Sequence, residues 1–197
     1  MISREDGMAL VRRHVTKKNL VKHALAVEAV LRSLARLFGE DEEVWGIAGL
    51  LHDLDYETTV DDPPRHGYVT REMLEGDDLP DEILQAIVAH VGHEGVERKT
   101  LLDKAIYCTD PVTGLIVASA LMHPSKSLAG MDAEFVGKRF REKRFAAGAD
   151  RDAIAECREL GLELHVFLGI ALEAMQGIAG DLGLQGTAHR SSGGAAT

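Results

Sequence analysis

The chain has 197 residues, of which 45% are hydrophobic, and a formal net charge of -10. A chain of this length and apolar content can bury one good core, so we expect a single domain. The acidic balance argues against general attraction to nucleic acid polymers or membrane surfaces, because both are polyanionic.

The cysteines and the chain ends also exclude some classes of protein. Cys108 and Cys157 show neither metal-type nor redox-type spacing, so no disulfide framework is expected. The opening MISREDGMAL carries acidic residues where a signal peptide has basic and then apolar ones. The most apolar late stretch, LHVFLGIALEAM, is too short for a membrane span and carries Glu173. We therefore expect a cytoplasmic protein with no membrane partner.

Helical periodicity runs along nearly the whole chain, and strand-like alternation is missing, which predicts an all-α fold. The first predicted helix spans 16–38, with apolar residues at three-and-four spacing that place His23 on the buried face. The second spans about 41–53 and begins with acidic residues, which suit a helix N-terminus. It brings His52 and Asp53 to its C-terminal end.

A loop is expected at 54–65, because the sequence DDPP within it cannot continue a helix. His66 then begins the next helix. A further helix begins at Pro80, which suits a first helical turn, and ends at His90. Since His90 lies seven residues after Ile83 on the apolar face, it is expected to point inward.

A long helix is predicted from Thr100 toward Met122. Thr100 and Asp103 resemble a capping pair at its start. Pro111 removes one backbone hydrogen bond and should bend the helix beside Asp110.

The last third of the sequence predicts three more helices, at 131–144, 151–160 and 162–179, with short connections. The expected result is one helical domain over 1–184, followed by a disordered tail over 185–197.

The helical pattern directs His23, His52, His90 and Asp110 inward. A single buried histidine is more often a core residue bonded to a backbone carbonyl. Several imidazoles and carboxylates on facing helices are costly to bury unpaired, whereas a divalent cation satisfies them all at once. The set contains no thiolate, whereas a structural zinc site would more often use cysteine. The donors therefore favour a non-structural site for Mn, Fe, Mg, Co or Zn.

Three segments carry a resemblance to a known family. His23, the stretch LLHDLDYE at 50–57 and the stretch TDPVTGL at 109–115 resemble the H…HD…D signature of the HD superfamily. The resemblance covers roughly 16–175, implies an HD-domain helical bundle, and is closest to the HDIG-type predicted hydrolases. Here Asp53 is followed by Leu54, which departs from the HDIG label.

The resemblance implies a metal-dependent phosphohydrolase that cleaves a small-molecule phosphoester, such as a nucleotide, by attack of a metal-bound hydroxide. His66 and His90 match histidines that bind a second ion in dinuclear relatives, so one or two divalent ions per chain are implied. The first ion's ligands would be His23, His52, Asp53 and Asp110.

Less specific interpretations of the extra histidines stay open. His66 could be an exposed residue at a helix start, and His90 a cation at a helix C-terminus. His93 is either an alternative ligand or a loop residue.

Asp55 and Glu57 follow the metal pair, where a carboxylate could orient the attacking water or protonate the leaving oxygen. The alternative is a solvated acidic loop. Candidates for binding the substrate phosphate are Arg139 and Lys143 in the densest basic cluster, and Lys126 in HPSKS. Helical spacing divides that cluster among faces, so most of it is expected to be solvated.

Two other functions stay open beside the hydrolase. Di-iron oxygenases of the same superfamily, such as inositol oxygenase and a phosphonate oxygenase, use a similar ligand set. The other possibility is a metal-stabilised binding module without turnover. The number of known relatives favours the hydrolase, whose partner would be a small phosphorylated molecule.

Overall fold

The computed structural model describes residues 1–186, and every regular element in them is a helix, which confirms the all-α prediction. Most of the tail predicted to be disordered, from residue 187 onward, lies outside the described residues.

Three helices form the N-terminal part of the fold: α1 (Arg4–His14), α2 (Lys18–Phe38) and α3 (Glu42–Leu51). The sequence predicted helices close to α2 and α3, but none at α1. A capping box explains this first helix, because the Ser3 side chain bonds the Asp6 backbone and the Asp6 side chain bonds the Ser3 backbone.

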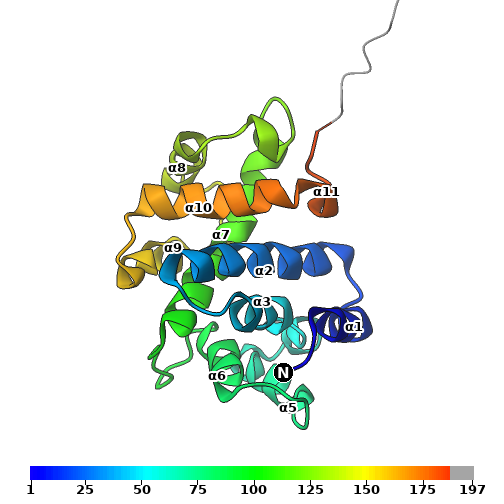
Figure 1. Ribbon diagram of the computed structural model, residues 1–197. Helices are drawn as coiled ribbons and strands as arrows, with labels where there is room; N and C mark the ends of the chain where they lie inside the picture. The colour runs from blue at the N-terminus through cyan, green and yellow to red at the C-terminus, as the bar shows by residue number, and fades with distance from the viewer. Residues whose placement is uncertain (187–197) are drawn as a thin grey trace, which may run out of the picture.

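Helices α2 and α3 run side by side across the middle of the molecule (Figure 1) and approach closely at Gly49. A Cβ atom at Gly49 would lie 3.0 Å from the Glu28 backbone, a tighter approach than nine in ten real Cβ contacts show, so the backbone would have to move. Glycine therefore sets the separation of the two helices just before α3 delivers His52.

The segment after α3 is more regular than predicted. The expected loop at 54–65 contains two short helices, because the Pro-Pro pair that cannot continue an α-helix is suited to a first helical turn. His66 ends the second of these and lies just before the next helix, rather than inside it. The elements are α4 (Tyr56–Thr59), the 3-10 helix η1 (Pro63–Arg65), α5 (Tyr68–Met73) and α6 (Asp81–Ala89).

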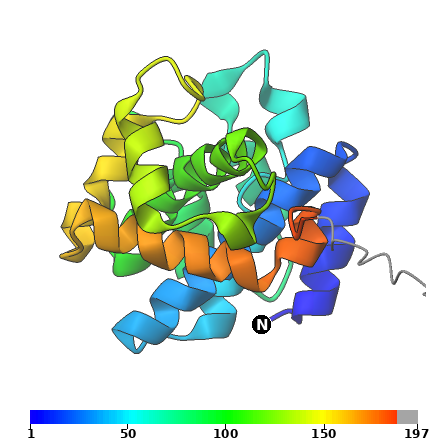
Figure 2. The same ribbon diagram turned by 90° about the horizontal axis from the view of Figure 1, so that it is seen from above.

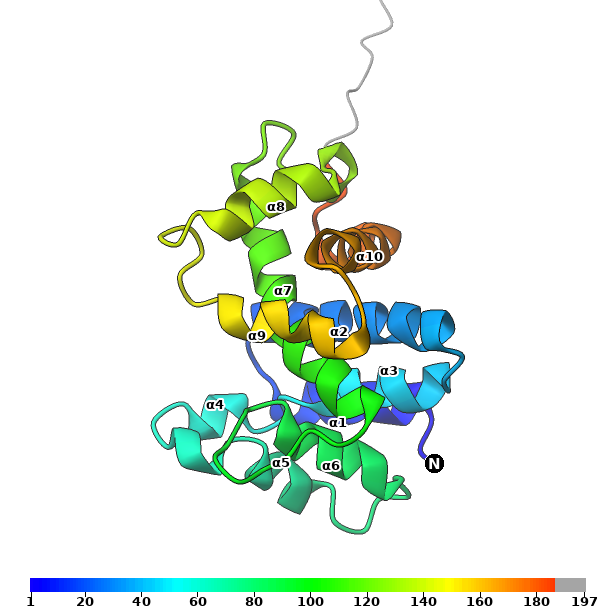
Figure 3. The same ribbon diagram turned by 90° about the vertical axis from the view of Figure 1, so that its left-hand side faces the viewer.

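Helix α7 (Leu101–Met122) passes through the centre of the fold and contacts α2, α3, α6, α8, α9 and α10 (Figure 3). It opens with the predicted Thr100–Asp103 capping box and runs on through Pro111. Among the described helices it alone is long and apolar enough to cross a membrane. Since 56% of that apolar stretch is buried inside the fold, it has the character of a core helix.

The C-terminal helices cover the far end of α7, and α8 and α10 pack against each other there (Figure 2). Helices α8 and α10 and the pair α9–η3 lie at the three predicted helices, while η2 and α11 were not predicted. Their bounds are η2 (Leu128–Gly130), α8 (Ala133–Arg141), α9 (Arg151–Ala155), η3 (Glu156–Leu160), α10 (Leu164–Gly177) and α11 (Ala179–Leu182).

Candidate metal centre

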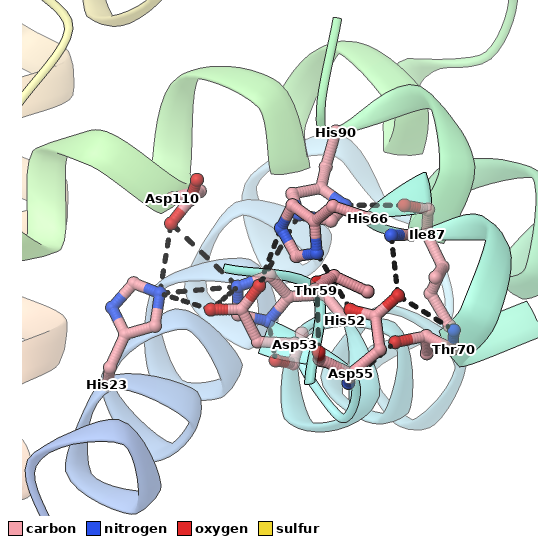
Figure 4. A network of polar contacts seen from close by, with 12 residues as sticks. His23, His52, Asp53, Asp55, Thr59, His66, Thr70, Ile87, His90 and Asp110 are labelled. Carbon is pink, nitrogen blue, oxygen red and sulfur yellow. Dashed lines mark hydrogen bonds and ion pairs between the residues drawn. The ribbon is translucent and has the colours of Figure 1, made fainter. Parts of the chain in front are cut away.

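The six side chains named as metal ligands from the sequence lie together (Figure 4). They come from the second turn of α2, from the C-terminal ends of α3, η1 and α6, and from the middle of α7. Five of them line one cavity of about 600 Å³, called here the metal cavity. The sixth, His52, is fully buried behind it. The six are His23, His52, Asp53, His66, His90 and Asp110.

Asp53 lies at the centre of the cluster, and its two oxygens face different histidines. Oδ2 is 3.5 Å from Nε2 of both His23 and His52. Oδ1 is 3.2 Å from Nε2 of His66 and 3.5 Å from Nε2 of His90. The carboxylate therefore divides the cluster into two groups of ligands.

Asp110 completes the first group. Its Oδ1 is 2.9 Å from Nε2 of His23 and 3.8 Å from Nε2 of His52. The two imidazole Nε2 atoms are themselves 3.2 Å apart. Three potential donor atoms thus surround one small volume.

Two of the imidazoles are oriented by the ends of helices. His52 and His90 each follow the last residue of a helix, and each directs Nδ1 to the carbonyl three residues earlier. The acceptors are Gly49 O, at 2.8 Å, and Ile87 O. Carbonyls in the last helical turn lack backbone partners, so they are free to accept these bonds. With Nδ1 donating outward, Nε2 presents a lone pair to the cluster.

The other two imidazoles are oriented by side chains. His66 Nδ1 lies 2.7 Å from Asp55 Oδ1. His23 Nδ1 lies 3.0 Å from the hydroxyl of Thr113, which gives its own hydrogen to the Asp110 carbonyl and so accepts from the imidazole. All four Nε2 atoms are therefore available to a shared partner.

This donor set fits a divalent cation. His90 Nε2 is buried without a hydrogen-bond partner among the described residues, which is costly unless another ligand satisfies it. Two groups have potential ligand atoms all within 4.8 Å of one another, namely His23 with His52 and Asp110, and His52 with Asp53 and His90. Nitrogen and carboxylate donors suit the metals expected from the sequence.

The carboxylates of the cluster raise the pKa values of two of its histidines. Burial lowers the pKa of His52, but Asp53 and Asp110 outweigh it and raise the pKa to about 9. Burial likewise lowers the pKa of His66, while its bonds to Asp53 and Asp55 raise it to about 10. Without a cation, these two imidazoles therefore hold a second proton, on Nε2, at neutral pH.

Asp55, expected as a catalytic acid or base, lies behind the cluster and does not line the metal cavity. Its side chain is fully buried, and both oxygens are already bonded. Oδ1 accepts from His66, while Oδ2 accepts from the backbone N–H groups of Gly67, at 2.8 Å, and Thr70, at 2.9 Å. Burial raises the pKa of Asp55, but these bonds outweigh it and lower the pKa. Asp55 thus positions His66 and does not face the cavity.

Glu57, the second expected catalytic carboxylate, also lies outside the metal cavity. It accepts hydrogen bonds from the backbone N–H groups of Thr16, at 2.9 Å, and Lys17, at 3.1 Å, which precede α2. The turn after Asp53 directs this side chain to the start of α2, so in this structure it anchors a helix end.

The three residues expected to bind the substrate phosphate are not brought to the cluster. Arg139 pairs with Glu142 at 2.8 Å, and Lys143 is exposed. Lys126 lines a separate cavity. Among the described residues, no lysine or arginine lines the metal cavity. His93, the alternative ligand, lies 2.8 Å from the His66 carbonyl and stacks on Tyr68.

Sequence reasoning missed several residues that build the site. Tyr56 and Tyr107 line the metal cavity, and Thr113 orients His23. Helical spacing could have found two of these, because Tyr107 and Thr113 lie three residues before and after Asp110. The wall formed by residues 146–150 carries no such local signal. Arg151 holds it by donating to backbone carbonyls in and beside it.

Comparison with known proteins agrees with this geometry. The HD domain family model matches residues 20–123, more than half of the 197-residue chain. Ribonuclease Y of Desulfotalea psychrophila is 30% identical over 97 residues, which is 49% of this chain but only 18% of that ribonuclease. No solved structure matches. The chain therefore belongs to the HD domain family, whose members are generally metal-dependent hydrolases.

Proposed function

We propose that this protein is a phosphohydrolase that cleaves a small-molecule phosphoester, such as a nucleotide, at a dinuclear metal centre. One observation carries the proposal: four imidazoles direct Nε2 toward two carboxylates inside one cavity. Hydrogen bonds hold each imidazole in that direction from behind, which is the usual way proteins orient metal-binding histidines.

The two oxygens of Asp53 suggest how the ligands are shared. His23, His52 and Asp110 would hold one ion together with Oδ2 of Asp53. His66 and His90 would hold the other together with Oδ1. Divalent cations supply Lewis-acid chemistry when bound, by polarising a phosphoryl oxygen and lowering the pKa of water.

Tyr107 is the residue best suited to assist at the phosphate. It lines the metal cavity, and the Arg98 guanidinium lies 3.9 Å from its ring centre. Burial raises the pKa of Tyr107 more than Arg98 lowers it, so the hydroxyl keeps its proton at neutral pH. It can therefore donate a hydrogen bond to a phosphoryl or leaving-group oxygen.

A small substrate is favoured over RNA. The name of the similar ribonuclease indicates RNA for that protein, but this chain covers 18% of it. Binding a polyanion draws on several lysine and arginine contacts. Here the net charge is -10, and none of the described lysines or arginines lines the metal cavity.

The same lack of cationic side chains favours a second candidate, a di-iron oxygenase acting on a less charged substrate. Its ligand set would be the same, and the two functions differ in metal identity and redox chemistry.

Metal analysis followed by activity assays separates these functions. The protein would be purified without added metal, analysed for bound elements, and assayed with Mn, Fe, Co, Mg or Zn against nucleotides, sugar phosphates and an RNA oligonucleotide. Release of phosphate from a small ester supports the proposal. Cleavage of RNA alone would show that the substrate is RNA and not a small phosphoester. Oxygen consumption with ferrous iron, without phosphate release, would show that the protein is an oxygenase and not a phosphohydrolase.

A further inference from the structure

A second cavity, of about 480 Å³, adjoins the metal cavity. His23 and Gly114 line both. Beyond them the walls are mostly aliphatic, and include Val117, Leu121 and Leu184. We call it the apolar cavity.

One face of α7 runs from the metal centre into the apolar cavity. Tyr107, Asp110 and Gly114 line the metal cavity, while Gly114, Val117 and Leu121 line the apolar cavity. Successive members are three or four residues apart, so they share one side of the helix. At the rise of an α-helix, Leu121 lies about 16 Å along the axis from Asp110. The two cavities thus adjoin along this side of α7, and we treat them together as one groove.

Gly114 lies where the two cavities meet. A Cβ atom there would find no neighbouring atom within 4 Å, so no packing contact requires glycine at this position. Gly49 is the opposite case, because a neighbouring backbone excludes its side chain. Since glycine inside a helix costs stability, its presence at an open position leaves room for something that passes over it.

The groove changes character along its length. At one end are carboxylates and imidazoles, and at the other are leucine, valine and alanine side chains. Lys22 alone among the described lysines and arginines lines either cavity, and its Nζ donates to the Leu182 carbonyl at 2.7 Å. A bipartite ligand fits this gradient: an anionic head at the metal centre and an uncharged apolar body beyond Gly114.

We propose that the apolar cavity is a subsite for the apolar organic group of the phosphoester, and that Gly114 determines whether that group can enter. The inference rests on the proposed function, since it assumes that the phosphate lies at the metal centre. It assigns the substrate class as a phosphomonoester with an extended apolar group.

Binding of n-alkylphosphonic acids with two, four, six and eight carbons tests the subsite without turnover. Calorimetry on the manganese-loaded protein should show affinity rising by up to about fourfold per buried methylene. In Gly114→Ala the ratio of octyl to ethyl affinity should fall by at least about tenfold. Alanine is a better helix former than glycine, so this variant should fold.

Two further variants sharpen the test. Leu121 is 56% exposed, so Leu121→Gln should fold and should weaken the octyl ligand selectively. Gly137→Ala is the matched control, because it lies on α8 and its Cβ would make only ordinary contacts at 3.9 Å. It should keep the wild-type dependence on chain length. Affinity that does not depend on chain length, or a Gly114→Ala variant with the wild-type ratio, would overturn the subsite.

Hydrolysis of the matching n-alkyl phosphates separates the two proposals. If the phosphonates show the length dependence but no alkyl phosphate is cleaved, the subsite stands and the phosphohydrolase fails. If ethyl and octyl phosphate are cleaved with equal kcat/KM and the phosphonates show no length dependence, the function stands and the subsite fails.

Discussion

The two halves of the metal centre are built by different means. In the inner half, His52 and His90 are almost fully buried, with side-chain exposures of 0% and 1%. Backbone carbonyls at helix ends hold them. In the outer half, His23 and Asp110 are 20% and 33% exposed, and the Thr113 side chain orients the imidazole. The inner ligands are thus held by the backbone, whereas His23 is held by a side-chain contact that a single substitution removes.

The largest expected effect comes from Asp53, whose two oxygens face the two groups of ligands. Asp53→Ala should lower the metal content from about two ions per chain to near zero, because both ions lose a charged ligand. Elemental analysis after dialysis measures this, with circular dichroism to verify folding. Glu75→Ala, at an exposed acidic position, is the control and should keep its metal. Full metal content in Asp53→Ala would refute the site.

Removing the two histidines proposed to hold one ion, His66 and His90, should cost that ion. Converting His66 and His90 together to Ala should lower the metal content from about two ions to about one per chain, and reduce turnover more than substrate binding. Elemental analysis and steady-state kinetics measure these effects. A wild-type protein that holds one ion at saturating Mn or Fe would instead indicate a mononuclear centre.

Metal binding should release protons. With pKa values of about 9 for His52 and about 10 for His66, both imidazoles are doubly protonated in the metal-free protein at neutral pH. Each must lose the Nε2 proton to bind a cation, so about two protons per chain should be released at about pH 7.5. Apparent metal affinity should therefore rise with pH up to about 10, the higher of the two pKa values. Calorimetry in buffers of different ionisation enthalpy counts the protons, and zero release would contradict the assignment.

The two loop carboxylates should differ in their effect on stability. Asp55→Asn should cost about 2–4 kcal/mol, because a buried carboxylate that accepts three hydrogen bonds is replaced by an amide with one acceptor oxygen. The lowered pKa of Asp55 means that its contribution is present above about pH 4 and lost as pH falls further. Urea unfolding of the metal-free protein measures both effects.

Glu57→Gln is the matched comparison. It should leave the urea midpoint of unfolding close to the wild-type value, because the amide oxygen can still accept from the exposed start of α2. Turnover should stay near the wild-type value. A large loss of turnover in Glu57→Gln would restore its role as an acid or base.

The smallest effect is expected in the outer half. Thr113→Val keeps the shape of the side chain but removes the oxygen that accepts from His23 Nδ1. Metal affinity should fall by about tenfold for one ion, as is usual when a partner behind a metal-binding histidine is lost. Titration with a competing chelator measures this. Unchanged affinity for both ions would show that α2 alone orients His23.

The sequence was most informative where a single helix decides the outcome. Apolar spacing placed His23 on the buried face of α2, and the Thr100–Asp103 pair marked the start of α7. It was least informative where a turn decides which way a side chain points. Asp55 and Glu57 were chosen for their nearness to Asp53, but the backbone after α3 directs one into the protein and the other toward α2.

The basic cluster does not line the metal cavity, and its part in binding phosphate stays a prediction. Arg139 has a partner three residues away, and its guanidinium lies over Phe135 and Phe145. Charge density along the sequence carries no information on such local pairing. The groove beyond Gly114 could not be predicted from the sequence either, because its walls depend on how α2 and α7 are placed relative to each other.

Gly49 links the architecture of the bundle to its chemistry. Its missing side chain lets α2 and α3 approach, and its carbonyl oxygen accepts from His52. Six ligands grafted onto another helical scaffold would therefore not reproduce this centre unless the host matched the spacing at that crossing. In a design, the α2–α3 pair with its glycine would have to be transferred together with the metal-binding side chains.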